Sequence, residues 1–158
     1  MNRRSSFSIT AAGFFGIALG LSAAIANAQD AAKKSISTPD APKAVGPYSQ
    51  AIAVGRTVYL AGQVAIDPKT NQFMTDESIE DQTRRALENL KAVLAADGLT
   101  MDDLASTTVF LKDMNDFGKM NEVYATYFKN APPARATVEV ARLSRDMKIE
   151  ISGIAVRP

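Results

Sequence analysis

The distribution of apolar and polar positions divides the chain into short strand-like runs and two longer helical stretches. Residues 50–54 and 57–61 are rich in apolar and β-branched side chains, and Gly55-Arg56 between them is typical of a tight hairpin turn. Residues 67–71, Asp-Pro-Lys-Thr-Asn, predict a further turn. The remaining predicted strands are a short one around 34–37 and longer ones at 105–112, 134–141 and 148–156.

The two helical stretches lie in the middle of the chain. Over residues 78–97, apolar side chains recur every three or four positions and charged ones lie mostly opposite. Acidic residues crowd the first turn, and Gly98 stands where a left-handed C-cap belongs. A second helix begins near Asn115-Asp116 and carries a stripe of aromatic and methionine side chains that we assign to the core. We expect it to end at Pro132-Pro133, because the residue before a proline avoids helical angles.

This order of elements predicts an α+β fold, with one mixed sheet and both helices packed on one of its faces. The chain supplies no cover for the other face. Apolar side chains there would have to be buried by another copy, so the topology itself suggests an oligomer.

Two charges, Arg135 and Glu150, fall within the last two strand-like runs. Each is either an ordinary surface position of a sheet or part of a site, because a charge at a core-like position is costly unless it is paired or used. If residues 134–141 and 148–156 form a simple hairpin, the two side chains share a face and lie roughly 13 Å apart, at about 3.3 Å per residue. That distance is too long for one small molecule within one chain, but it is compatible with a site shared between neighbouring chains.

The N-terminal residues 1–28 have the features of a signal peptide. Arg3-Arg4 supplies the positive start, residues 11–26 form an uncharged apolar run, and Ala26-Asn27-Ala28 has the small-x-small form of a cleavage site. The run is shorter than the stretch of about 20 residues that spans a bilayer, so a retained anchor is the alternative interpretation. We expect an exported, periplasmic protein that is not held at a membrane after cleavage; the arginine pair leaves twin-arginine export open.

Cleavage after Ala28 leaves a tether at 29–43, which contains the first short strand, and a domain at 44–158. It removes two arginines and no acidic residue, which lowers the formal net charge from +1 to −1 and argues against nucleic acid as a partner. The chain has no cysteine and no histidine, which excludes disulfides, thiolate chemistry, Ser-His-Asp triads and histidine-ligated zinc. Any catalysis must use carboxylates, arginines, hydroxyls, amides and the backbone.

Five segments resemble the RidA family of enamine/imine deaminases, and they cover nearly all of the mature domain in the right order. They are GPYSQA (46–51), LAGQ (60–63), TTVFLKDMNDFGKMN (107–121), PARATVEVARL (133–143) and KIEISGIAV (148–156). The resemblance implies a chorismate-mutase-like fold, a homotrimer and active sites in the clefts between subunits. It also implies hydrolysis of 2-aminoacrylate and related 2-imino acids to 2-keto acids and ammonia, without a metal or organic cofactor.

The resemblance also assigns roles to particular residues. Arg135 matches the arginine that binds the substrate carboxylate, and Glu150 matches the glutamate associated with the reacting water. The other matching substrate-site positions are Tyr48 in the pocket, Gly62 with its backbone facing the site, Asn121 as a supporting amide, and Thr137, where cysteine is common. A planar guanidinium binds a carboxylate bidentately, and one carboxylate with a tuned pKa can manage the protons of water attack.

Besides Thr137, two positions depart from the family pattern. Ala61 stands where many members have serine or threonine, and Ser152 replaces a second acidic residue of the last strand. The loss of a hydroxyl at position 61 keeps a second hypothesis open, a non-catalytic small-carboxylate-binding or chaperone-like protein. An endoribonuclease is the least favoured alternative, given the charge of the mature chain and the absence of histidine.

Overall fold

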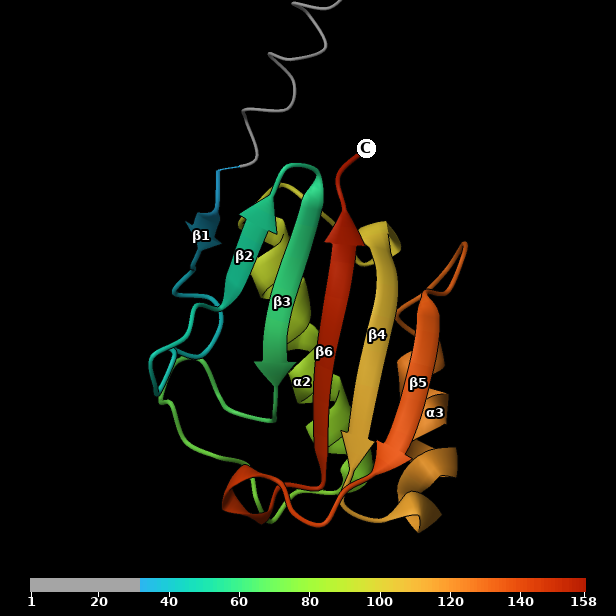
Figure 1. The fold of residues 1–158 in the computed structure, drawn as a ribbon. Coiled ribbons are helices and arrows are strands. Elements are labelled where there is room, and N and C mark those ends of the chain that lie inside the picture. The colour runs from blue at the N-terminus through green and yellow to red at the C-terminus, as the bar shows by residue number, and fades with distance from the viewer. Residues whose placement is uncertain (1–31) are drawn as a thin grey trace, which may run out of the picture. The chain divides into compact units, whose positions relative to one another are not determined.

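Six strands form one mixed sheet in the computed structural model, which describes residues 32–158 (Figure 1). The predicted signal peptide, its cleavage site and the start of the tether lie outside the described residues. The strand order is β1-β2-β3-β6-β4-β5, and only β4 and β5 run parallel. The strands are β1 (Lys34–Ile36), β2 (Ala51–Val54), β3 (Thr57–Gln63), β4 (Leu104–Leu111), β5 (Ala134–Glu139) and β6 (Ile149–Val156). The predicted mixed sheet is confirmed, and it includes part of the predicted tether as β1.

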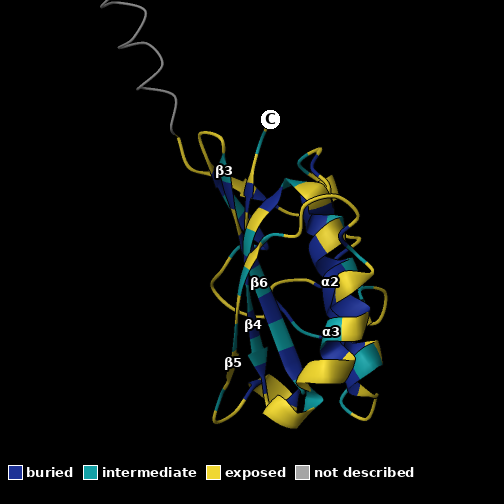
Figure 2. Ribbon diagram, turned by 90° about the vertical axis from the view of Figure 1, so that its right-hand side faces the viewer, coloured by how far each residue is buried: buried dark blue, intermediate teal, exposed yellow. Residues whose placement is uncertain are grey.

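Two helices, α2 (Ile79–Ala95) and α3 (Phe117–Ala125), cover one face of the sheet (Figure 2). The Ser78 hydroxyl caps α2 by accepting a hydrogen bond from the Asp81 N–H at 3.1 Å. At the other end Gly98 has φ +74°, as predicted for a left-handed C-cap. None of the helices within residues 32–158 is long and apolar enough to cross a membrane.

The helix α3 is shorter than the sequence predicts. It follows a short 3-10 turn, η2 (Met114–Asp116), and ends at Ala125, well before Pro132-Pro133. The N–H groups of Thr126 and Tyr127 bind carbonyls three residues back, at 3.1 and 3.2 Å. These 3-10-type hydrogen bonds end the helix several residues before the two prolines.

The predicted hairpin between the last two strands is wrong, because β4 lies between β5 and β6. Thr107 of β4 pairs with Arg135 on one side and Gly153 on the other, whereas Phe110 pairs with Glu150. The cause is the helix α3 between β4 and β5, since a crossover helix makes its two strands parallel neighbours. Thr107 and Phe110 are three residues apart on β4, and side chains an odd number of residues apart on a strand point to opposite faces. Their partners Arg135 and Glu150 therefore point to opposite faces of the sheet.

No helix of the described residues covers the second face of the sheet, which we call the open face (Figure 2). It is formed by the side chains that alternate with the buried ones along each strand. Its exposed large apolar residues are Val54, Tyr59, Val138, Ile154 and Val156, each more than a third exposed. An apolar surface of this kind is typical of a protein interface.

Candidate active site

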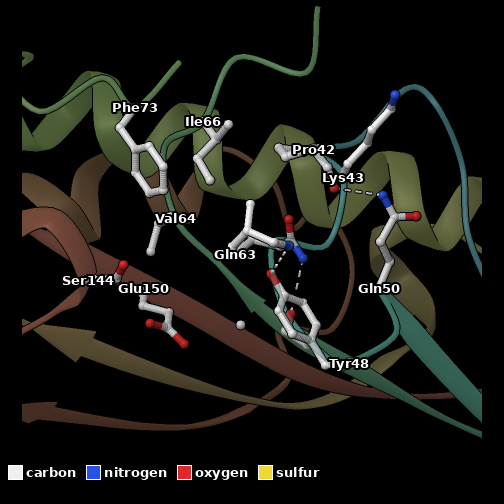
Figure 3. A pocket seen from close by; sticks show the side chains of 13 residues that line it. Pro42, Lys43, Tyr48, Gln50, Gln63, Val64, Ile66, Phe73, Ser144 and Glu150 are labelled. Atoms are coloured by element: carbon white, nitrogen blue, oxygen red, sulfur yellow. Dashed lines mark hydrogen bonds between the residues drawn. The ribbon is translucent and has the colours of Figure 1, made fainter. Parts of the chain in front are cut away.

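Tyr48, Gly62 and Glu150 line one cavity of about 390 Å³ on the open-face side of the sheet (Figure 3). Glu150 comes from β6, where its neighbours Ile149 and Ile151 point into the core. Gly62 lies where the pairing of β3 with β6 shifts between Leu60 and Gln63, as at a β-bulge. Tyr48 stands in the loop before β2 and is half exposed. We call these three residues the glutamate half-site.

The carboxylate of Glu150 lies directly against the α-carbon of Gly62. A Cβ atom built on Gly62 would come 2.7 Å from the Glu150 Cδ and would overlap one carboxylate oxygen. Real Cβ atoms do not approach other atoms so closely, so a side chain at position 62 and this position of the carboxylate exclude each other.

Burial raises the pKa of Glu150 above its ordinary value of 4.5. Within residues 32–158 no neighbouring charge or hydrogen bond opposes this effect of burial on the pKa. A half-buried carboxylate without an ionic partner keeps its lone pairs for a substrate or a water. The raised pKa makes it a better proton acceptor than an exposed glutamate, and the same group can return the proton.

Arg135 is held on the helix-covered face, at the edge strand β5. Its guanidinium donates a hydrogen bond to the Asn121 Oδ1 at 2.8 Å and lies over the ring of Tyr124, 4.5 Å from the centroid. The Tyr124 hydroxyl is itself hydrogen bonded to the buried Thr107 at 2.7 Å, which fixes the ring. No carboxylate of the described residues forms an ion pair with Arg135. We call Asn121 and Arg135 the arginine half-site.

The arginine half-site borders a second cavity, of about 470 Å³, between α3 and the diproline segment Pro132-Pro133. The guanidinium has five N–H donors in a planar fork, and Asn121 uses only part of them. The remaining donors match the two oxygens of a carboxylate. The arrangement is therefore a positioned anion receptor.

The structure divides the predicted site residues between two places. Tyr48 and Gly62 accompany Glu150, and Asn121 accompanies Arg135. Thr137 lines neither cavity: it lies two residues beyond Arg135 on β5, and its buried hydroxyl has no hydrogen-bond partner among the described residues. The predicted common face for Arg135 and Glu150 within one chain is wrong, since β4 separates their strands and their side chains point apart.

Sequence reasoning missed Tyr124, which it assigned only to the core stripe of the second helix. The spacing between Asn121 and Tyr124 could have indicated that Tyr124 belongs to the site, because residues three apart on a helix lie on the same side. It also missed the far wall of the glutamate cavity, which comes from residues on either side of the predicted turn at 67–71 and from Ser144. No motif marks that wall: its residues are Val64, Ile66, Phe73 and Ser144.

The fold and the two half-sites define a class of small α+β domains built on one mixed sheet with an uncovered face. A sequence model described as Endoribonuclease L-PSP matches residues 38–157 of the chain. A RutC family protein of Pyrococcus horikoshii is 54% identical over 125 residues, which is 79% of this chain and 98% of that protein. A 2-iminobutanoate/2-iminopropanoate deaminase of Salmonella typhimurium is 50% identical over 127 residues, 78% of this chain and 98% of the enzyme.

The chain therefore belongs to the RidA/YjgF/L-PSP family. Among solved structures, Escherichia coli TdcF with bound serine matches with a TM-score of 0.76 and 43% identity, over 79% of this chain and 99% of TdcF. The family resemblance inferred from the five segments is confirmed, and so is the α+β sheet with two helices.

Proposed function

We propose that the protein is a hydrolytic deaminase of enamine and imine acids of the 2-aminoacrylate type, which it converts to 2-keto acids and ammonia. The observation that carries the proposal is Glu150, a half-buried carboxylate with a raised pKa and no ionic partner within residues 32–158, held beside a preformed cavity. Arg135, a positioned guanidinium that no carboxylate of the described part of the chain pairs with, supplies the complementary anion receptor. The 50% identity to the Salmonella deaminase supports the same reaction class.

The chemistry needs only these groups and a water. The enamine tautomerises to an imine, whose carbon is electrophilic, and Arg135 holds the substrate carboxylate in a bidentate pair. Glu150 accepts a proton from the attacking water as the C–O bond forms, which gives a carbinolamine. The carboxyl passes that proton to the nitrogen, and it then carries the proton of the carbinolamine hydroxyl to the same nitrogen as the C–N bond breaks, so that ammonia and the 2-keto acid leave.

We also propose that the working protein is a homotrimer whose sites lie between subunits. Arg135 and Glu150 lie on opposite faces of one sheet, so a single chain cannot apply both to one small acid. A second copy on the open face would bury its apolar side chains and could bring its arginine half-site to the glutamate half-site. The number three follows from the resemblance to RidA deaminases. Light scattering should give three times the mass of the mature chain, and a monomer at micromolar concentration would remove the basis for a shared site.

The direct test of the activity is the release of keto acid and ammonia from 2-imino acids generated in place by an amino acid oxidase. Release faster than the uncatalysed hydrolysis supports the deaminase. The competing function is a non-catalytic binder of small carboxylates, and Ala61, which lines the glutamate cavity without a hydroxyl, favours it. Binding of a keto acid without any acceleration of hydrolysis would establish that alternative.

We further propose that residues 1–28 direct export to the periplasm and are removed after Ala28. The support is the charged start, the apolar run and the small residues at the cleavage site. Mass spectrometry of the exported protein should find Gln29 at the N-terminus. An uncleaved chain that fractionates with the membrane would contradict the proposal.

A further inference from the structure

Ser144 lies at the edge of the glutamate cavity, next to Glu150 (Figure 3). It begins the short 3-10 turn η3 (Ser144–Asp146) between β5 and β6 and is exposed in the single chain, so solvent reaches this edge of the cavity. Within residues 32–158 the hydroxyl is not hydrogen bonded to the Glu150 carboxylate, because such a bond would lower the pKa and burial is the one cause of its shift. A third group can therefore bind to both side chains.

The other polar side chains that line the cavity have hydrogen-bond partners already or point elsewhere. The amide nitrogen of Gln50 donates to three backbone carbonyls. That of Gln63 donates to a backbone carbonyl at 3.3 Å, and the Tyr48 hydroxyl accepts from a backbone N–H at 3.4 Å. Figure 3 shows Lys43 directed away from the carboxylate. Ser144 is therefore the side chain best placed to bind a water beside the carboxylate.

The turn η3 has an unusual backbone conformation. Arg145 and Asp146 both have φ +56°, in the left-handed region that residues other than glycine seldom adopt. The side chains on either side of the turn, Leu143 and Met147, are buried, and the Arg145 guanidinium lies over the ring of Phe73, 5.6 Å from its centroid. Strain of this kind persists only where the surroundings enforce it, and it is concentrated at functional sites. These contacts make the turn a fixed part of the cavity wall.

We propose that Ser144 is a catalytic residue that holds the attacking water together with Glu150. The inference rests on the proposed deaminase function and adds a second partner for its water, since a fixed water needs at least two polar partners. One hydrogen of the water binds the Glu150 carboxylate and the other binds the Ser144 Oγ, which leaves a lone pair of the oxygen to attack the imine carbon. Glu150 takes the first proton. The serine keeps its own proton and forms no covalent bond.

The wall that β3 contributes to the cavity offers no hydroxyl to this water. Ala61 lines the cavity from β3, and its side chain is a methyl group. Ser144 supplies the hydroxyl from a different element of the fold. A hydroxyl placed at position 61 should therefore substitute for the one at position 144, which a purely structural role of Ser144 does not predict.

The kinetic test removes the hydroxyl and then returns it. Ser144→Ala should lower kcat for 2-imino acids about tenfold, the rate equivalent of one hydrogen bond, with the affinity for pyruvate unchanged. Ser144→Thr keeps the hydroxyl and should retain most of the activity. Ala61→Ser should restore most of the rate lost in Ser144→Ala, but should leave the rate of the wild type nearly unchanged. Ser35→Ala is the matched control, because Ser35 is an exposed serine of β1 that does not line the cavity.

Two results would overturn the inference. An unchanged kcat in Ser144→Ala would show that the hydroxyl does not touch the attacking water, and the deaminase would still stand. A loss of kcat that follows a loss of thermal stability, and that Ala61→Ser does not repair, would make Ser144 a structural residue of the turn.

A crystal structure separates this inference from the proposed activity. We expect a water within about 2.5–3.0 Å of both the Ser144 Oγ and a Glu150 carboxylate oxygen, and its loss in Ser144→Ala. If that water is present in a protein that accelerates no imine hydrolysis, the proposed deaminase fails and the shared water site stands. If no water contacts both groups in an active enzyme, the deaminase stands and the role of Ser144 is rejected.

Discussion

The Glu150 carboxylate occupies the space that a side chain on Gly62 would need. A Cβ atom at position 62 would come 2.7 Å from the Glu150 Cδ, and no left-handed φ requires glycine there. Gly62 is therefore required for the room it leaves, since β3 passes close beneath the proposed catalytic group. The two residues form one unit of the site although they are far apart in the sequence.

Gly62→Ala should thus displace the carboxylate while the fold survives. The clash falls on the far end of a flexible side chain, so Glu150 moves and the backbone stays. A displacement of about 1 Å at a reacting group costs roughly 10²-fold in rate, and we expect that loss in kcat/KM with a thermal unfolding curve close to wild type. Gly118→Ala is the control, because a Cβ there meets nothing within 4 Å. Wild-type turnover in Gly62→Ala would mean that the position of Glu150 does not matter.

Glu150→Gln keeps the shape of the side chain but cannot accept a proton from water. We expect kcat to fall by about 10²–10⁴, with the affinity for a keto acid largely unchanged. Steady-state kinetics together with keto acid binding make this separation. If the glutamine variant deaminates at the wild-type rate, Glu150 is a surface carboxylate and the proposed mechanism is wrong.

The raised pKa of Glu150 predicts two opposite dependences on pH. Activity requires the carboxylate form, so kcat/KM should fall on the acid side at a pH above the ordinary glutamate value of 4.5. Stability behaves differently: the folded state binds this proton more tightly than the unfolded state does. The Glu150 contribution to the free energy of unfolding should therefore decrease as the pH rises from 4.5 through the raised pKa. Denaturant titrations of wild type and Glu150→Gln across that window should show the decrease in wild type only.

Most of the fold was predictable because local patterns determine it. The stripe over α2 and the glycine after it agree with the structure, and so does the β2–β3 hairpin at Gly55. Strand neighbours are set by long-range pairing, which periodicity does not encode. The short connection from 140 to 148 favoured a hairpin, whereas the crossover through α3 decides the pairing and places β5 beside β4.

The residues of the site were predictable from motifs, but their arrangement was not. The motif segments named Arg135, Glu150 and the residues around each of them. The faces of Arg135 and Glu150 depend on which residues of β4 they pair with. These partners, Thr107 and Phe110, are known only from the observed strand register. The far wall of the glutamate cavity could not be found, because hydrogen bonds from Asn89, more than twenty residues away in sequence, hold Val64 and Ile66 in place.

Arg135→Lys keeps the charge but loses the planar fork. We expect the affinity for carboxylate-bearing ligands to weaken by about 1–3 kcal/mol, with KM affected more than kcat. Lysine also loses the stacking geometry over Tyr124. Arg142→Lys is a suitable control, because Arg142 is exposed and pairs with Asp146 on the surface. Equal losses of activity and of stability in Arg135→Lys would point to a structural charge instead.

The ion pair between Arg157 and Asp97 should stabilise the C-terminal end of β6. Two guanidinium nitrogens of Arg157 bind the Asp97 Oδ2, at 2.9 and 2.6 Å, and the Asp97 side chain is 7% exposed. Asp97→Asn should lower the free energy of unfolding by about 1.5–3 kcal/mol, the usual contribution of a hydrogen bond to a charged group. Glu88→Gln, which removes an exposed pair with Lys91 at 3.7 Å, should cost under about 1 kcal/mol. If both variants lose similar amounts of free energy of unfolding, the burial of Asp97 does not strengthen its ion pair with Arg157.

A site shared between subunits predicts that two inactive variants restore each other. Arg135→Ala retains the glutamate half-site and Glu150→Gln retains the arginine half-site, so each variant alone has no complete site. When the two are unfolded together and reassembled in equal amounts, random mixing pairs an intact arginine half-site with an intact glutamate half-site in roughly a quarter of the clefts. The deaminase rate should rise to about that fraction of wild type, far above the residual rate of either parent.

The control for this experiment replaces one parent and leaves everything else unchanged. Arg135→Ala mixed with the double variant Arg135→Ala/Glu150→Gln has no intact arginine half-site in any subunit, so no activity should return. The two single variants combined without unfolding should also stay inactive until their subunits exchange. If the reassembled single variants recover nothing although light scattering shows mixed oligomers, then Arg135 and Glu150 do not meet across the subunit interface. The opposite faces on which the fold places them would then have to serve two separate sites.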